Sequence, residues 1–208
     1  MLETRLLAAI APHDLLCHPF YRAWSMGTLT RRDLAAYAAQ YQHQVDALPA
    51  LLREALAQTG EPALLRNLAE EEGEEGTPHA ALWARFAGAL EAAPAAPAAE
   101  TREAAAALAA LCAEGPVQSL AALWAYELQT SRVAGPKRAG LAGYGVSETA
   151  FFALHEELDV HHARDLLEAL LRRCGDDAAL QDEACAAAVR GAQAQWRFLD
   201  GVERRRSV

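Results

Sequence analysis

The chain has 208 residues, of which 52% are hydrophobic, and it carries a formal net charge of −9 at neutral pH. This length fits one domain spanning residues 1–208, and the negative charge without a basic stripe argues against nucleic-acid binding. There is no run of about 18 apolar residues and no signal-peptide pattern, so we expect neither a membrane span nor secretion.

The cysteine pattern bears on the cellular compartment. Cys17, Cys112, Cys174 and Cys185 are widely spaced, and no two of them form a CxxC pair. Such scattered cysteines are typical of reduced thiols and not of a disulfide framework. We therefore expect a cytoplasmic protein.

Alanine and leucine dominate the composition and no alternating strand pattern occurs, which predicts an all-α fold. In chain order, apolar spacing and capping signals predict helices at about 3–16, within 18–30, and at 31–58, 62–72, 77–90, 100–114, 116–133, 147–174 and 177–203. The Pro/Ala-rich stretch 91–100 and the glycine-rich stretch 135–147 predict loops. These elements favour a single compact bundle of seven to eight helices.

The helix predicted at 147–174 carries the clearest chemical signal. His155, Asp159 and His162 follow the spacing i, i+4, i+7, which places all three side chains on one face of a helix. Two imidazoles and a carboxylate on a core-facing stripe are costly unless they are paired. A bound metal ion would satisfy all three, so the spacing indicates a metalloenzyme.

Further candidate ligands lie upstream. Glu127 interrupts the strongly apolar helix LAALWAYELQT, and His79 falls in the first turn of the helix predicted at 77–90. An acidic run precedes His79, and the residues alone do not select a ligand from its members, which are Glu70, Glu71, Glu72, Glu74 and Glu75.

Three histidines and three carboxylates suit iron or manganese better than zinc, for which the cysteines are badly placed. Three carboxylates would offset most of the charge of two divalent ions. We therefore expect two transition-metal ions, Fe and/or Mn, with molecular oxygen as the co-substrate.

Four segments together resemble the heme-oxygenase-like di-iron oxidases: HPFYRAWSMGTLT, the acidic run leading to HAALW, the AYE around Glu127, and HEELDVHH. The resemblance covers about residues 10–200. It implies the seven-helix fold shared with thiaminase-type and pyrroloquinoline-quinone-synthase proteins. It also implies a six-residue ligand set and selects Glu72 from the acidic run, giving Glu72, His79, Glu127, His155, Asp159 and His162.

Within that superfamily the chain is most similar to the CADD-type para-aminobenzoate synthases, named for chlamydial proteins that associate with death domains. HPFY and Lys137, the only lysine of the chain, carry this similarity. It implies a self-sacrificing enzyme for folate biosynthesis in which Tyr21 supplies the aromatic ring and Lys137 the amine. By the same analogy Tyr126 and Tyr41 are radical relays or cavity walls.

Two other functions remain open from the sequence. The same di-metal site would also suit an oxygenase for an external fatty acid, amino acid or amine. A helical protein-interaction module with a vestigial metal site is the third alternative. For either enzyme we expect an external reductant and no nucleic-acid or membrane partner. The sequence leaves the oligomeric state open, with a homodimer as one candidate.

Overall fold

The computed structural model describes residues 1–74 and 76–206, and the regular structure in these ranges is entirely helical. The predicted all-α class is therefore confirmed, with nine α-helices in these ranges where seven to eight were expected. The helices are α1 (Leu2–Ile10), α2 (Pro19–Ser25), α3 (Arg31–Thr59), α4 (Pro62–Glu72), α5 (His79–Ala89), α6 (Ala99–Glu114), α7 (Pro116–Leu141), α8 (Ala150–Cys174) and α9 (Ala178–Glu203).

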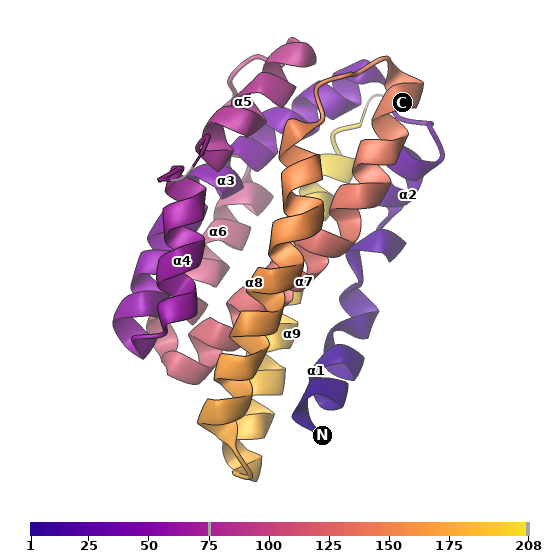
Figure 1. Cartoon of the computed structure of the whole chain (residues 1–208). Helices are drawn as coiled ribbons and strands as arrows, with labels where there is room; N and C mark the ends of the chain where they lie inside the picture. The colour runs from indigo at the N-terminus through magenta and orange to yellow at the C-terminus, as the bar shows by residue number, and fades with distance from the viewer. Residues whose placement is uncertain (75, 207–208) are drawn as a thin grey trace.

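Helix α7 forms the centre of the bundle. It packs along α8 and α9 and also contacts α2, α3 and α6. In Figure 1, α3 to α6 lie on one side of the α7–α8 pair, and α1 and α2 lie on the other. Residues 119–127 of α7 are all buried, as expected for a helix that is surrounded by neighbours. A polar residue in this stretch, such as Glu127, therefore points into the protein.

The turn between α4 and α5 brings two chemically important helix ends together. Gly73 ends α4 with a left-handed φ of 75°, and a Cβ there would lie 2.5 Å from the nitrogen of Pro78. Only glycine fits this close approach without strain. As a result the last turn of α4 lies beside the first residue of α5, which is His79.

The loop predicted at 135–147 is largely wrong, because α7 continues to Leu141. Gly135 and Gly140 serve close packing, whereas Gly145 takes a left-handed φ of 66° in the turn that follows. A Cβ on Gly135 would lie 2.8 Å from Glu156 of α8, and a Cβ on Gly140 would lie 2.8 Å from the Trp24 ring of α2. Lys137 consequently lies on a buried helix and not in a solvated loop.

Other boundaries agree within a few residues. A capping box begins α3 at the expected position, with Thr30 as N-cap and Asp33 at the third position. The first helix stops at Ile10, earlier than expected, and short 3-10 turns around Pro12 follow it because proline cannot continue the backbone hydrogen bonding. No helix within the described ranges is long and apolar enough to cross a membrane.

Candidate metal centre

Two groups of three buried side chains meet in the interior. Glu71, His79 and His155 form the first triad, and Glu127, Asp159 and His162 form the second. Within each triad one ligand atom per residue lies within 4.8 Å of the others. Helices α4, α5, α7 and α8 supply these residues, so the site exists only when four helices are packed together.

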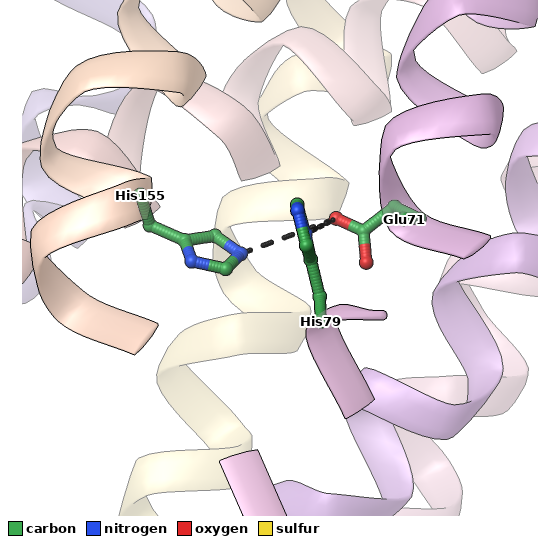
Figure 2. A group of neighbouring side chains, drawn as sticks. All are labelled: Glu71, His79 and His155. Carbon is green, nitrogen blue, oxygen red and sulfur yellow. Dashed lines mark ion pairs between the residues drawn. The ribbon is translucent and has the colours of Figure 1, made fainter. Parts of the chain in front are cut away.

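Figure 2 shows the first triad converging from α4, α5 and α8. The Nδ1 atom of His79 lies 2.8 Å from Oε1 of Glu71, and Nε2 of His155 lies 4.0 Å from the same oxygen. Nδ1 of His155 lies 2.7 Å from the Phe151 carbonyl, to which it donates. Burial lowers the pKa of His155 to about 3, so this ring is neutral and its Nε2 lone pair faces the triad.

The second triad lies at the α7–α8 contact. Oε1 of Glu127 accepts a hydrogen bond of 2.8 Å from the Asn67 amide. Nδ1 of His162 lies 3.8 Å from Glu127 and also 3.8 Å from Asp159. Burial, together with Glu127 and Glu71, raises the pKa of Asp159 well above its ordinary value. Burial disfavours the charged form of His162, but the carboxylates of Glu127 and Glu70 outweigh it and raise its pKa to about 9.

Several ligand atoms lack a hydrogen-bond partner among the described residues. They are both carboxylate oxygens of Asp159 and Nδ1 of His162. Buried polar atoms are normally satisfied, and an unpaired buried carboxylate is especially costly. These atoms all belong to the second triad, so a cation there would satisfy them. The donor set of three imidazoles and three carboxylates fits two divalent transition metals.

The structure places one of the six predicted ligands, Glu72, away from both triads. Glu72 is exposed and pairs with Arg53 on α3, whereas Glu71 points into the first triad. Glu74 is also exposed, and Glu75 lies outside the described residues. Helical geometry explains why Glu71 and not Glu72 points inward. Leu64, Leu68 and Glu71 share one face of α4 at spacings of four and three, and Glu72 lies off that face. The other five predicted ligands all lie in the two triads.

The four predicted catalytic residues, Tyr21, Tyr41, Tyr126 and Lys137, are also buried together. The Nζ atom of Lys137 lies 4.4 Å from the centroid of the Tyr21 ring. It lies 2.9 Å from the Tyr37 hydroxyl, which in turn lies 3.0 Å from the hydroxyl of Tyr21. Burial lowers the pKa of Lys137 to about 7, although Asp159 partly opposes this. A large fraction of this amine is therefore neutral near pH 7.

One small cavity adjoins the two triads, and a second adjoins the lysine. The first, of about 10 Å³, touches both triads and is lined by Tyr41 and Tyr126, whose hydroxyls lie 3.4 Å apart. The second, also about 10 Å³, is lined by Tyr21, Tyr41 and Lys137. Each has room for about one water-sized molecule. Tyr41 lines both cavities, so it separates the triads from the Tyr21–Lys137 pair.

Sequence reasoning missed three residues that contact the predicted site residues, namely Tyr37, Asn67 and Glu70. Tyr37 lies four residues before Tyr41 on α3, a spacing that places both hydroxyls on one face of the helix. Asn67 lies four residues before Glu71 on the apolar face of α4, where a polar residue signals a buried partner. Glu70 contacts His162 across α4 and α8, which no local pattern reveals.

Known structures share this architecture. A TenA homolog from Pseudomonas syringae superposes with a TM-score of 0.81 at 17% identity, over 98% of this chain and 93% of that one. A domain with a heme oxygenase-like fold from Shewanella denitrificans gives 0.70 at 20% identity, over 98% and 90%. The predicted heme-oxygenase-like fold is therefore confirmed, and it encloses a cluster of metal-type ligands.

Sequence comparison extends this beyond the fold. Residues 32–196 match a family described as iron-containing redox enzymes. A protein named 4-aminobenzoate synthase from Nitrosomonas europaea is 35% identical, over 93% of this chain and 87% of that protein. One of the same name from Chlamydia trachomatis is 37% identical, over 89% and 85%. The chain belongs to the family of iron-containing redox enzymes, and it is an oxidoreductase with a metal cofactor.

Proposed function

We propose that the protein is a 4-aminobenzoate synthase that uses two transition-metal ions, Fe and/or Mn, and molecular oxygen, and that its product serves folate biosynthesis. The names of its relatives support the product. Glu71, His79 and His155 would hold one ion and the second triad the other. When bound, such a metal pair supplies the capacity to activate oxygen and to take electrons from a nearby phenol.

The observation that carries the proposal is the contact between Tyr21 and Lys137 inside a closed interior. The amine lies over the ring at 4.4 Å, and neither side chain is more than about 5% exposed. The adjoining cavities of about 10 Å³ are too small for an aromatic substrate from solution. This arrangement supports the proposal that side chains of the chain itself supply the ring and the amine of the product.

The protonation states of these groups suit this role. Burial raises the pKa of Tyr21 well above its ordinary value, so its phenol keeps its proton at neutral pH. The Lys137 amine, with a pKa of about 7, offers a lone pair under the same conditions. Tyr41 lines the cavity beside this pair and also the cavity beside the triads, where its hydroxyl lies 3.4 Å from that of Tyr126, an arrangement that suits electron transfer. Oxygen is the oxidant and an external reductant supplies the remaining electrons.

An isotope experiment tests self-sacrifice directly. Because Lys137 is the only lysine, protein grown with ε-¹⁵N-lysine carries that label at one position, and ring-¹³C-tyrosine labels the tyrosines. We expect doubly labelled 4-aminobenzoate, at no more than one equivalent per chain, after iron, reductant and oxygen are added without substrate. Unlabelled product would contradict the proposal.

Two variants identify the ring donor in the same experiment. Tyr21→Phe should keep its metals and lose product, because the ring then lacks its oxidisable hydroxyl. Tyr144→Phe is the matched control, since the Tyr144 hydroxyl contacts only backbone atoms, including the Trp24 carbonyl at 3.0 Å. Unchanged yield from the Tyr21 variant would exclude it as the ring donor.

One observation favours the alternative of an external substrate. An open cavity of about 550 Å³ lies between the α4–α5 turn and α8, and it reaches His79 of the first triad. A fatty acid, amino acid or amine of modest size would fit there. Product formation that requires an added small molecule, with no mass loss from the protein, would establish this alternative. Less than about half an equivalent of bound metal would instead favour the vestigial site.

The cellular setting is part of the proposal. All four cysteines are free. Free thiols, one of them on the exposed Cys17, suit a reducing compartment, so we expect the enzyme to work in the cytoplasm.

A further inference from the structure

His162 differs from His155 in the partner of the ring nitrogen that faces away from the candidate metal site. Its Nε2 lies 2.6 Å from a carboxylate oxygen of Glu70. Its Nδ1 is buried, has no hydrogen-bond partner among the described residues, and lies 3.8 Å from both Glu127 and Asp159. One nitrogen of the ring therefore contacts a carboxylate on α4, and the other faces the two carboxylates of the second triad.

These contacts define which nitrogen can bind a metal. A carboxylate can only accept, so the hydrogen bond to Glu70 places the proton of the neutral ring on Nε2. The lone pair is then on Nδ1, which faces the other two members of the triad. Rotation of the ring about its own axis would break the contact with Glu70, so the same bond fixes both tautomer and orientation.

In the first triad, His155 has a backbone partner on its own helix. His155 donates from Nδ1 to the carbonyl of Phe151, one turn earlier on its own helix, and stacks on the Phe151 ring at 3.8 Å. That arrangement needs no residue from another helix. His162 depends on Glu70, whose side chain is 38% exposed and comes from α4. The orientation of His155 therefore depends on its own helix, whereas the orientation of His162 depends on a side chain from α4.

We propose that Glu70 is a positioning residue that orients His162 for metal binding at the second triad only. Adjacent acids of α4 then have separate tasks: Glu71 is a ligand of the first triad, Glu70 supports the second, and Glu72 pairs with Arg53. The inference rests on the proposed metal centre. Partners of metal-bound histidines of this kind change metal affinity by about 10- to 100-fold when removed.

Titration of the metal-free full chain with Mn²⁺ measures the affinity of each site without turnover. Binding is monitored through the decrease of the EPR signal of free Mn²⁺. We expect the wild-type chain to bind two ions. Glu70→Ala should weaken one of them by about tenfold or more and leave the other unchanged. Glu70→Gln keeps an oxygen that accepts from Nε2, so it should bind this ion at least about threefold more tightly than Glu70→Ala does. Glu72→Ala, the neighbouring acid, should bind as wild type does.

A double-mutant cycle separates positioning from general charge loss. In a His155→Ala background, where the second triad remains intact, Glu70→Ala should weaken Mn²⁺ binding about tenfold or more. In a His162→Ala background the same change should have no effect, because the ring that Glu70 orients is gone. An equal loss in both backgrounds, or Gln behaving as Ala, would overturn the positioning role.

The outcomes also separate this inference from the proposed function. A wild-type chain that binds no Mn²⁺ would refute the metal centre itself. A wild-type chain that binds two ions, together with a Glu70→Ala variant of unchanged affinity, would refute only the role of Glu70. Complete loss of one site in both Glu70→Ala and Glu70→Gln would make Glu70 a direct ligand and also overturn the positioning role.

Discussion

At the scale of single residues, a shift of one position along α4 decides which acid reaches the first triad. Family resemblance selected Glu72, whereas the apolar face of α4 carries Leu64, Leu68 and Glu71 inward. The helical periodicity needed to choose Glu71 is present in the sequence. By contrast, nothing local predicts that Asn67 bonds Glu127 or that Glu70 bonds His162, since these contacts join helices distant in the chain.

The inward placement of Glu71 on α4 leads to a direct prediction about metal binding. Glu71→Ala should remove one of the two bound metal ions, because the first triad loses its only carboxylate. Glu72→Ala should retain both ions, since it loses only an exposed pair with Arg53, worth at most about 1 kcal/mol. Metal analysis of both purified variants checks this, and full occupancy in Glu71→Ala would refute the assignment.

Lys137 should impose a pH-dependent cost on stability. Its pKa falls from 10.5 in the unfolded chain to about 7 in the fold because the amine is buried. Between these values the unfolded chain binds a proton that the folded chain does not, so stability rises with pH in this window. Below about pH 7 both forms are protonated and the full cost is present.

Replacing the amine tests that cost. Lys137→Met should be more stable than the metal-free wild type by roughly 4 kcal/mol or less at pH 6 to 7, and the difference should shrink toward pH 10. Urea unfolding at several pH values measures it. A difference that stays constant across this range would show that Lys137 does not titrate as burial implies.

At the scale of helices, most elements could be predicted from apolar spacing and caps. Thr30 as N-cap and Gly60 as the terminating glycine, for example, mark the two ends of α3. The end of α7 could not. Glycine and proline near 135–140 are typical of a loop, but here they lie in a helix that packs closely on Trp24 and Glu156. Only the neighbouring helices distinguish these two uses of glycine, and those neighbours are not visible in local sequence.

The close contact at Gly140 has a measurable consequence. Gly140→Ala should destabilise the fold by about 1 to 3 kcal/mol, because its Cβ would lie 2.8 Å from a buried indole that also bonds the Lys137 carbonyl. Gly143→Ala is the matched control, since no atom lies within 4 Å of its added Cβ. Thermal unfolding should show a lower Tm for the first variant only, and equal Tm values would contradict this packing.

At the scale of the whole molecule, the bundle encloses its chemistry. The two triads, the tyrosines at 37, 41 and 126, and the Tyr21–Lys137 pair form one continuous buried group built from α2, α3, α4, α5, α7 and α8. The chain order of these residues runs from 21 to 162, so the group is a product of the fold and not of any local motif. The sequence predicted most of its members, and packing supplied their arrangement.

The central claim is that six inward side chains from four helices hold two transition-metal ions. Anomalous diffraction from crystals at the iron and manganese absorption edges tests it most directly. We predict two peaks, one within bonding distance of Glu71, His79 and His155 and the other within bonding distance of the second triad. The absence of peaks, or a peak beside Glu72 and away from these residues, would contradict the account.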